Sequence, residues 1–424
     1  MSIFAAFRPL RDRAVATMWL GQAASTIGEE VYRVAVVWLA VEAVGNLAAR
    51  VNAAQYLAML VVGLLGAPLI DRWRADRAMI GSKIGSAALA LVPVLGFYIW
   101  GVSVPLLVLS VMGIAALRMV FTPALQQTIP LLAPDRAALQ AVNGLIDITW
   151  RLARLFGPAV TAFLELFLPV IHFLSATAIG FALSALAMAT IRDRLVDRDA
   201  KPRPAGGGWR GAWESMTEGA RLMRRERIMG FLILMNALVM GPWSVALQLA
   251  LALIVKEHNP TSFGIDGLAA LAVIISFVGV GDVLGNLLVA SLRLRRPLST
   301  MFLGYVAMGG GFAVMAVCVW ILPNPYMLPA MMLAGFVGGV GGPFFFIPMI
   351  TRLQTVYRGP EIARVFRLRL AIMAAAMLIA NVAAEPLFDW IGAALTELLC
   401  GLFIVAVGLG GHWHFRRLEN RGTI

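Results

Sequence analysis

Charged side chains stand inside several long apolar stretches of this sequence, and they are the residues best placed to carry out chemistry. Glu29, Glu30 and Arg33 lie near the centre of the first stretch, and Arg118 lies at a similar depth in the fourth. Because an ionised group near the middle of a bilayer costs about 2.5 kcal/mol or more, such groups are usually paired, face a cavity and are functional. Burial disfavours the charged form of a carboxyl group, whereas a neighbouring Arg favours it. We therefore expect Glu29 and Glu30 to exchange protons near neutral pH.

A third carboxyl group of this kind lies in the fifth stretch. Asp147, Arg151 and Arg154 have the spacing i, i+4, i+7, which places them along one face of a helix. We expect Asp147 to join the proton-exchanging acids. An alternative is that Asp147–Arg151 and Glu30–Arg33 are permanent ion pairs that hold helices together.

The charge balance of this cluster bears on the substrate. Three acids and four Arg residues leave one net positive charge when all are ionised, which favours a substrate whose anionic group is bound by Arg. The four candidate substrate-binding residues are Arg33, Arg118, Arg151 and Arg154. The second half of the chain offers fewer charges, with Asp282 about two-thirds of the way along its stretch and Glu385 near the outer end of another. We therefore expect largely apolar substrate contacts from that half, drawn from Phe231, Trp243, Phe344 and Phe345, although aromatic residues in such stretches more often pack or face lipid.

The apolar stretches that position these residues fill almost the whole chain. The sequence is 60% hydrophobic and 14% charged, and roughly a dozen stretches have about the 20 residues that an α-helix needs to cross a bilayer. They fall approximately at 14–43, 50–70, 79–100, 104–128, 138–168, 170–190, 228–255, 267–291, 299–322, 327–350, 363–388 and 391–413. The pattern predicts an all-α integral membrane protein with twelve transmembrane helices.

Most of the positive charge lies on alternate connections between the stretches, where Arg residues cluster. By the positive-inside rule these connections and both termini are cytoplasmic. We expect a multi-pass protein of the bacterial cytoplasmic (inner) membrane that contacts membrane lipids. The net charge of +12 is thereby explained without a nucleic-acid partner, because no basic stripe interleaved with aromatic residues is present.

The two halves of the chain resemble each other at an offset of about 225 residues, an arrangement common in transporters. Pro123 corresponds to Pro348, and Gly157-Pro158 corresponds to Glu385-Pro386. We expect two six-helix bundles related by a pseudo-twofold repeat. Residues 1–195 would form the first bundle, 196–227 a cytoplasmic linker with an amphipathic helix, and 228–424 the second bundle.

Several motifs resemble the major facilitator superfamily, and the resemblance covers essentially the whole chain. The segment Gly66–Arg77 is similar to the cytoplasmic signature between helices two and three of that superfamily, and Arg118 is placed like its Arg in helix four. Gly157 and Pro158 match positions of the antiporter signature in helix five. The opening segment Trp19–Glu29 resembles the branch that contains enterobactin exporters and macrolide-efflux proteins.

This resemblance implies the fold of the superfamily and a set of gating residues. The gating candidates are Asp71, Arg72, Arg77, Gly157 and Pro158. In particular, the resemblance places Asp71 and Arg72 at a cytoplasmic gate. The alternative is that these two residues only fix topology.

The sequence offers no signal for catalysis, a metal or a cofactor. Cys318 and Cys400 lie in apolar stretches without disulfide or metal spacing, and the four His residues form no cluster. Gly338–Gly342 lacks the Lys-Ser/Thr of an ATP-binding loop and is expected to pack helices. We therefore expect no enzyme but a monomeric, proton-coupled exporter of an amphipathic small molecule such as a siderophore or drug. Alternatives are a lysophospholipid or siderophore importer or flippase of the same fold, and a membrane assembly partner without transport.

Overall fold

A computed structural model describes residues 8–65, 74–133, 136–195, 208–291, 296–357 and 360–420 of this chain. Within these ranges the secondary structure is helical, apart from one isolated bridge between Ser262 and Ile265. The long helices of the first half are α2 (Arg13–Val44), α3 (Ala48–Leu65), α5 (Ala75–Trp100), α6 (Val104–Thr128), α7 (Arg136–Glu165) and α8 (Ile171–Thr190). The short 3-10 helices there are η1 (Arg8–Arg11), η2 (Gly45–Leu47), η3 (Ile129–Leu132) and η4 (Arg192–Arg194).

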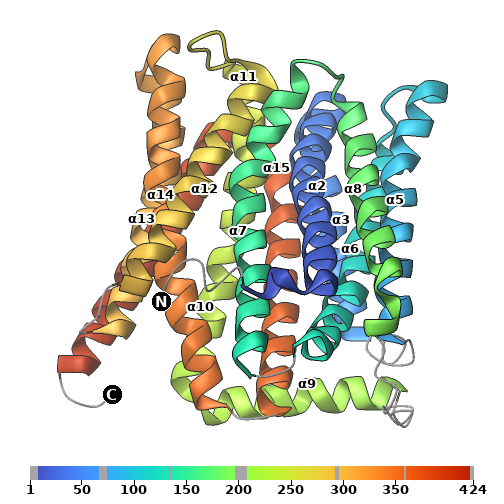
Figure 1. The fold of residues 1–424 in the computed structure, drawn as a ribbon. Coiled ribbons are helices and arrows are strands. Elements are labelled where there is room, and N and C mark those ends of the chain that lie inside the picture. The colour runs from blue at the N-terminus through green and yellow to red at the C-terminus, as the bar shows by residue number, and fades with distance from the viewer. Residues whose placement is uncertain are drawn as a thin grey trace. The chain divides into compact units, whose positions relative to one another are not determined.

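The second half repeats this succession of long helices (Figure 1). Its helices are α9 (Gly208–Arg225), α10 (Arg227–Ser244), α11 (Leu251–His258), α12 (Gly267–Ser291), α13 (Pro297–Ile321), α14 (Asn324–Val356) and α15 (Pro360–Asn420). A fully buried π-helical segment, η5 (Val245–Ala250), joins α10 to α11 into one continuous span. The α15 range contains two helices that meet at Gly392, whose φ of 79° lies in the left-handed region that glycine adopts without strain.

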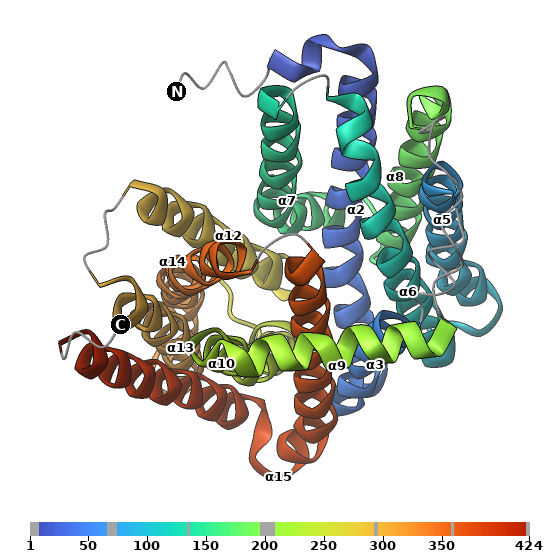
Figure 2. The same ribbon diagram turned by 90° about the horizontal axis from the view of Figure 1, so that it is seen from below.

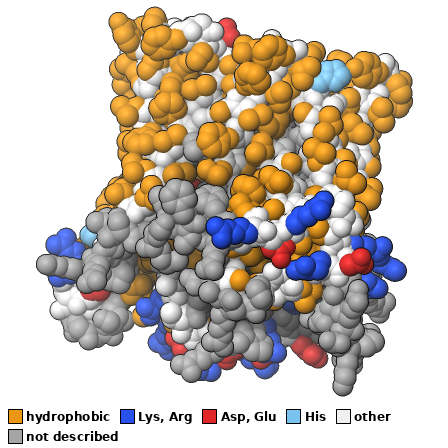
Figure 3. All heavy atoms as spheres, viewed as in Figure 1, with side chains coloured by type: hydrophobic (Ala, Val, Ile, Leu, Met, Phe, Trp, Pro, Cys, Tyr) orange, Lys and Arg blue, Asp and Glu red, His pale blue; other side chains and the backbone are white. Residues whose placement is uncertain are grey.

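Nine stretches of the described residues are long and apolar enough to cross a membrane. Two of them, Arg13–Leu64 and Arg364–Asn420, contain two spanning helices each, and the more highly charged α7 adds another. This accounts for the twelve predicted helices. On the face drawn in Figure 3, hydrophobic side chains cover the upper part, whereas Lys, Arg, Asp and Glu gather at the lower end.

The chain forms two compact units. Unit 1 contains residues 1–39 and 54–214, and unit 2 contains residues 40–53 and 215–424. The segment Ala40–Ala53, which connects α2 to α3, thus belongs to the second unit although it comes from the first half of the sequence. The sequence pattern had suggested a division of the chain only near residue 196.

Close helix packing in both units depends on small residues. In unit 1, a Cβ atom added to Gly180 of α8 would lie 2.9 Å from the Ala24 carbonyl oxygen of α2. In unit 2, a Cβ added to Gly341 of α14 would lie 2.1 Å from the Gly304 carbonyl oxygen of α13. Backbones approach this closely only where side chains are absent, which is how helices associate inside a membrane.

Helix α9 runs at a steep angle to the spanning helices, at the end where α10 begins (Figures 1 and 2). Within unit 2, Gly219 of this helix lies against the backbone of Arg364, and Glu218 forms an ion pair with the same Arg364. The Tyr357 hydroxyl donates a hydrogen bond to the Leu222 carbonyl oxygen over 3.3 Å. Burial raises the pKa of Tyr357 to about 12, so the hydroxyl remains a donor at physiological pH. These contacts hold the amphipathic helix against α14 and α15.

Candidate functional site

A cluster of charged side chains lies in the interior of unit 1. The Glu29 carboxylate on α2 accepts a hydrogen bond from the Lys83 ammonium group on α5, with 3.1 Å between Oε1 and Nζ. Its second oxygen, Oε2, is buried, has no hydrogen-bond partner in the part of the chain that the structure describes, and lies 3.9 Å from Nη1 of Arg118 on α6. Glu29 therefore links α2 to both α5 and α6.

Lys83 is the residue of this cluster that the sequence interpretation missed, although it falls near the beginning of the predicted stretch 79–100. Its side chain is only 4% exposed. The ammonium nitrogen lies 4.1 Å from the ring centroid of Phe121 and 5.1 Å from that of Phe181. Aromatic faces stabilise a desolvated ammonium group, and the Glu29 carboxylate balances its charge. The available signal was that Lys83 follows Ala75 by two helical turns and so falls inside a span.

Glu30 faces a different set of neighbours. It forms an ion pair with Arg33 one turn along α2, over 2.5 Å from Oε2 to Nη2, as the ion-pair interpretation predicted. Arg118 and Arg154 also lie close enough to act on Glu30 electrostatically. A Cβ atom added to Gly157 of α7 would lie 2.3 Å from the Glu30 Cβ, so Gly157 allows α7 to pack directly against this acid. The predicted gating residue Gly157 thus contacts a predicted proton-exchanging residue.

The remaining α7 candidates are only partly described. Asp147 and Arg151 lie on α7, but their side chains fall outside the described part of the structure. Arg154 is exposed, and Pro158 is buried within the helix. The roles assigned to these residues remain predictions.

Asp71 and Arg72 also lie outside the described residues, and Arg77 is exposed at the beginning of α5. Next to Arg77, the buried Asp76 carboxylate forms ion pairs with Arg74 over 3.1 Å and with Arg192 over 2.8 Å. The second of these contacts ties the beginning of α5 to η4. The sequence interpretation did not single out Asp76.

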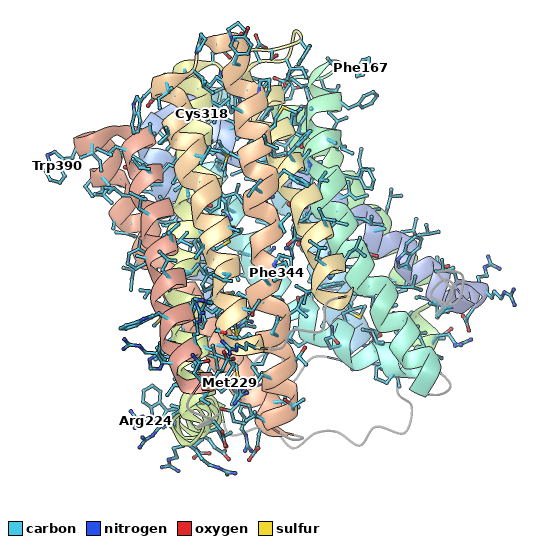
Figure 4. The ribbon with its side chains drawn as sticks, turned by 90° about the vertical axis from the view of Figure 1, so that its left-hand side faces the viewer. Phe167, Arg224, Met229, Cys318, Phe344 and Trp390 are labelled. Atoms are coloured by element: carbon cyan, nitrogen blue, oxygen red, sulfur yellow. The ribbon has the colours of Figure 1, made fainter. Side chains whose placement is uncertain are left out.

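The predicted aromatic residues of unit 2 fall into two groups. Phe345 is completely buried and stacks on Tyr305 with ring centroids 4.0 Å apart, and Phe231 packs against Phe302 and Phe415. Both belong to one aromatic cluster. Trp243 and Phe344 are partly exposed, and Figure 4 shows Phe344 partway along α14. Whether any of them contacts substrate remains a prediction.

Unit 2 also contains buried charged groups that the sequence interpretation missed. Arg369 on α15 is 3% exposed and donates a hydrogen bond to the side-chain oxygen of Asn236 over 3.1 Å. Glu397, farther along α15, is completely buried, and neither of its carboxyl oxygens has a hydrogen-bond partner among the described residues. The earlier expectation of a second half with few deeply placed charges therefore needs correction, since both residues lie inside predicted spans.

The segment Ala40–Ala53 is attached to the rest of unit 2 by polar contacts, which we call the segment latch. Arg50 binds Glu385 through two hydrogen bonds of 2.5 and 2.6 Å. Asn52 donates to Asn381 over 2.7 Å, and Asn381 donates in turn to Ser244 over 2.8 Å. The Lys256 ammonium group donates to the Val41 carbonyl oxygen over 2.6 Å. Glu385 is thus engaged by an ion pair.

The described residues include no group of three or more His, Cys, Asp or Glu side chains able to hold a metal ion. Cys318 and Cys400 are free thiols. The site of unit 1 therefore consists of carboxylates and cations on membrane-spanning helices, an arrangement suited to moving protons or binding charged substrate groups.

The family model of transmembrane secretion effectors matches residues 4–341 of the chain. The chain belongs to this family. It is a secondary transporter of the major facilitator superfamily, in agreement with the resemblance found in its motifs. The more specific branch containing enterobactin exporters remains a prediction.

Curated relatives are similar over most of the chain. The multidrug efflux pump Tap of Mycobacterium tuberculosis is 27% identical over 396 residues, which cover 90% of this chain and 88% of that protein. The uncharacterized MFS-type transporter YfiS of Bacillus subtilis is 24% identical over 83% of this chain and 81% of its own length.

Solved transporter structures share the fold at low sequence identity. A mutant of the peptide transporter POT in complex with sulfate superposes with a TM-score of 0.75 at 14% identity, covering 96% of this chain and 94% of that chain. A mutant of the nucleoside transporter NupG superposes with a TM-score of 0.72 at 13% identity, covering 96% and 99%. These similarities support the architecture alone.

Proposed function

We propose that this protein exports amphipathic small molecules from the cytoplasm in exchange for protons. The observation that carries the proposal is the contact of Glu29 with the buried Lys83 and the partly exposed Arg118, in a chain whose family is that of transmembrane secretion effectors. The multidrug efflux activity named for the Mycobacterium relative supports a drug-like substrate. The absence of an ATP-binding loop in the sequence supports an ion gradient as the energy source.

Glu29 is the proposed proton carrier because its two oxygens are in different situations. Lys83 donates to Oε1, while Oε2 is buried and accepts no hydrogen bond from any described residue, so a proton is best accepted at Oε2. Protonation neutralises the carboxylate and leaves the Lys83 ammonium group buried without a counter-ion. That state is relieved when α2 and α5 shift, so proton binding would drive a change in the conformation of unit 1.

The segment latch is the proposed outer gate. Topology inferred from the Arg distribution places the α2–α3 connection and Glu385 at the non-cytoplasmic side. Alternating access requires that this side open once per cycle. The Arg50–Glu385 pair, which lies near the surface, would release first, and the buried Asn52–Asn381 contact would release last.

Reconstituted protein tests the coupling. In proteoliposomes with an imposed pH gradient, the wild type should drive uphill movement of fluorescent amphipathic drugs that carry an anionic group, and Glu29→Gln should abolish the dependence on the gradient. Downhill exchange of the same drug should persist in Glu29→Gln, which shows that the variant is folded. Asp193→Asn, an exposed acid on η4, is the matched control and should behave as wild type. Unchanged gradient-driven transport in Glu29→Gln would refute this role.

Substrate class is tested in the same vesicles with a panel of drugs, siderophores and lysophospholipids. Export of drugs without movement of lysophospholipids supports the proposal, whereas lysophospholipid flipping alone would favour the lipid alternative. Failure to transport any compound, while the protein remains folded, would favour an assembly role.

Topology is tested by cysteine labelling in cells, after replacement of Cys318 and Cys400. We propose an inner-membrane protein with cytoplasmic termini. A membrane-impermeant reagent added outside should label a Cys at position 324 and spare a Cys at position 205. The reverse pattern would contradict this orientation.

A further inference from the structure

Arg369 is a buried cation that no carboxylate neutralises among the residues that the structure describes. It is 3% exposed, and its Nη2 donates to Asn236. Its Nε is buried and finds no hydrogen-bond partner within the described ranges. In unit 1, by contrast, the similarly buried Lys83 is paired with Glu29. A guanidinium group in this situation retains unused donors and an uncompensated charge.

The surroundings of Arg369 combine polar and aromatic groups. Asn236 on α10 receives the Arg369 hydrogen bond and donates its own amide to the Tyr305 hydroxyl over 3.2 Å. The ring centroids of Phe346 and Phe366 lie 5.2 and 5.6 Å from the guanidinium carbon. Helices α10, α13, α14 and α15 of unit 2 therefore converge on this group.

Phe346 and Phe366 connect the buried Arg369 to the surface, which a buried hydrogen bond alone would not do. Both rings are partly exposed, at 47% and 37%, although the Arg that they contact is not. Phe346 lies two residues after Phe344, which Figure 4 shows partway along α14. The two rings therefore lie between the buried guanidinium group and the surface of unit 2.

We propose that Arg369 and its partners Asn236 and Tyr305 form a binding site for an anionic oxygen group, carboxylate, sulfate or phosphate, of an amphipathic molecule. The planar guanidinium fork offers Nε to such a group, and charge-assisted bonds of this kind are among the strongest available. The rings of Phe346 and Phe366 would contact the apolar part next to the anion. The anion comes either from a transported substrate, in which case the inference rests on the proposed export function, or from a membrane phospholipid.

Direct binding to the full-length protein tests the site without any ion gradient. Purified protein in phosphatidylcholine nanodiscs is equilibrated with radiolabelled dodecyl phosphate and, separately, with dodecanol, which has the same chain and no anion. Binding to empty nanodiscs is subtracted. We expect the wild type to bind dodecyl phosphate about tenfold more tightly than dodecanol, the effect of one charge-assisted contact.

Three variants assign the effect. Arg369→Gln should bind both compounds equally, and Arg369→Lys should retain part of the preference because it keeps the charge and loses the fork. Arg367→Gln, two residues away and exposed, is the matched control and should keep the full preference. Undiminished dodecanol binding and an unchanged gel-filtration profile verify folding. A preference for dodecyl phosphate that survives in Arg369→Gln, or that is absent in the wild type, would overturn the proposal.

A second arm identifies the source of the anion. Addition of phosphatidylglycerol to the nanodiscs should weaken dodecyl phosphate binding in the wild type if a lipid phosphate occupies the site, and should leave it unchanged if the site is reserved for substrate. Either result is consistent with an anion site. Loss of gradient-driven transport in Glu29→Gln would leave these binding results unaffected, so the two proposals fail independently.

Discussion

The two units bury charge in different ways. In unit 1 the ammonium group of Lys83 and the carboxylate of Glu29 lie within 3.1 Å, and Asp76 is buried between two Arg residues. In unit 2 Arg369 has only a neutral amide and aromatic rings, and Glu397 has no hydrogen-bond partner among the described residues. Among the described residues, Lys83 and Asp76 of unit 1 are thus paired with opposite charges, whereas Arg369 and Glu397 of unit 2 are not.

This difference separates two tasks. In a balanced pair such as Glu29–Lys83, a proton can replace the cation as the partner of the carboxylate. Arg118, which lies near the same carboxylate, already competes with Lys83 for it. An isolated buried cation gains a counter-ion only when an anionic ligand binds to it. An isolated carboxyl group in apolar surroundings is stable in its uncharged form. Unit 1 is therefore suited to proton coupling, and unit 2 is suited to ligand binding and packing. The variants below test this contrast in order of expected effect.

The pairing in unit 1 should be expensive to break. Lys83→Met leaves the Glu29 carboxylate buried next to only the more distant Arg118, and loss of one partner of a buried ion pair costs about 3–5 kcal/mol. Thermal unfolding of purified protein, followed by tryptophan fluorescence, measures the loss. The double variant Glu29→Gln/Lys83→Met should recover most of it. Equal instability of the single and double variants would mean that packing, not charge balance, is the cause.

The position of Glu30 should depend on the small residue that faces it. A Cβ at residue 157 would lie 2.3 Å from the Glu30 Cβ, so Gly157→Ala forces α7 away from α2 and should destabilise the protein by about 1–3 kcal/mol. Gly81→Ala is the control, because a Cβ there meets no atom within 4 Å. In that variant helix propensity should stabilise the protein by up to about 1 kcal/mol. The same unfolding assay compares the two variants, and equal stabilities would contradict a close contact between residue 157 and Glu30.

The segment latch should depend more on its buried amide than on its exposed ion pair. Asn381 is completely buried, and Asn381→Leu leaves the Ser244 hydroxyl and the Asn52 amide without this contact, at a cost of about 1–2 kcal/mol. Glu385→Gln should change stability less, because the Arg50 side chain is 71% exposed and water replaces the bond. Chemical unfolding curves of the two variants measure the order. A larger loss of stability in Glu385→Gln than in Asn381→Leu would mean that the ion pair, not the buried amide, is the stronger contact of the latch.

The isolated acid of unit 2 should be the least sensitive position. If Glu397 is uncharged, replacement of its hydroxyl by an amide in Glu397→Gln should change stability by less than about 1 kcal/mol. The difference in stability loss between Glu397→Gln and Lys83→Met tests most directly whether the two units bury charge differently. A loss of several kcal/mol in Glu397→Gln, measured in the same unfolding assay, would indicate that this carboxylate is ionised and has an unrecognised partner.

Much of this architecture follows from the chain itself. Apolar length alone predicts the spanning helices, because a bilayer leaves the backbone of a spanning segment few alternatives to a helix. The positions of Glu29, Glu30 and Arg118 were visible for the same reason, since a charge in an apolar stretch is rare and costly. The Glu30–Arg33 pair was predictable because its partners are one helical turn apart.

The partners of the other charges were decided only by tertiary structure. Lys83 lies 54 residues from Glu29, and Arg50 lies 335 residues from Glu385, so no local periodicity relates them. Inclusion of Ala40–Ala53 in unit 2 and the isolation of Arg369 depend likewise on which helices pack together. Helical periodicity fixes the face on which a side chain lies, but the neighbour that meets that face is chosen by close approach of backbones at residues such as Gly157 and Gly341.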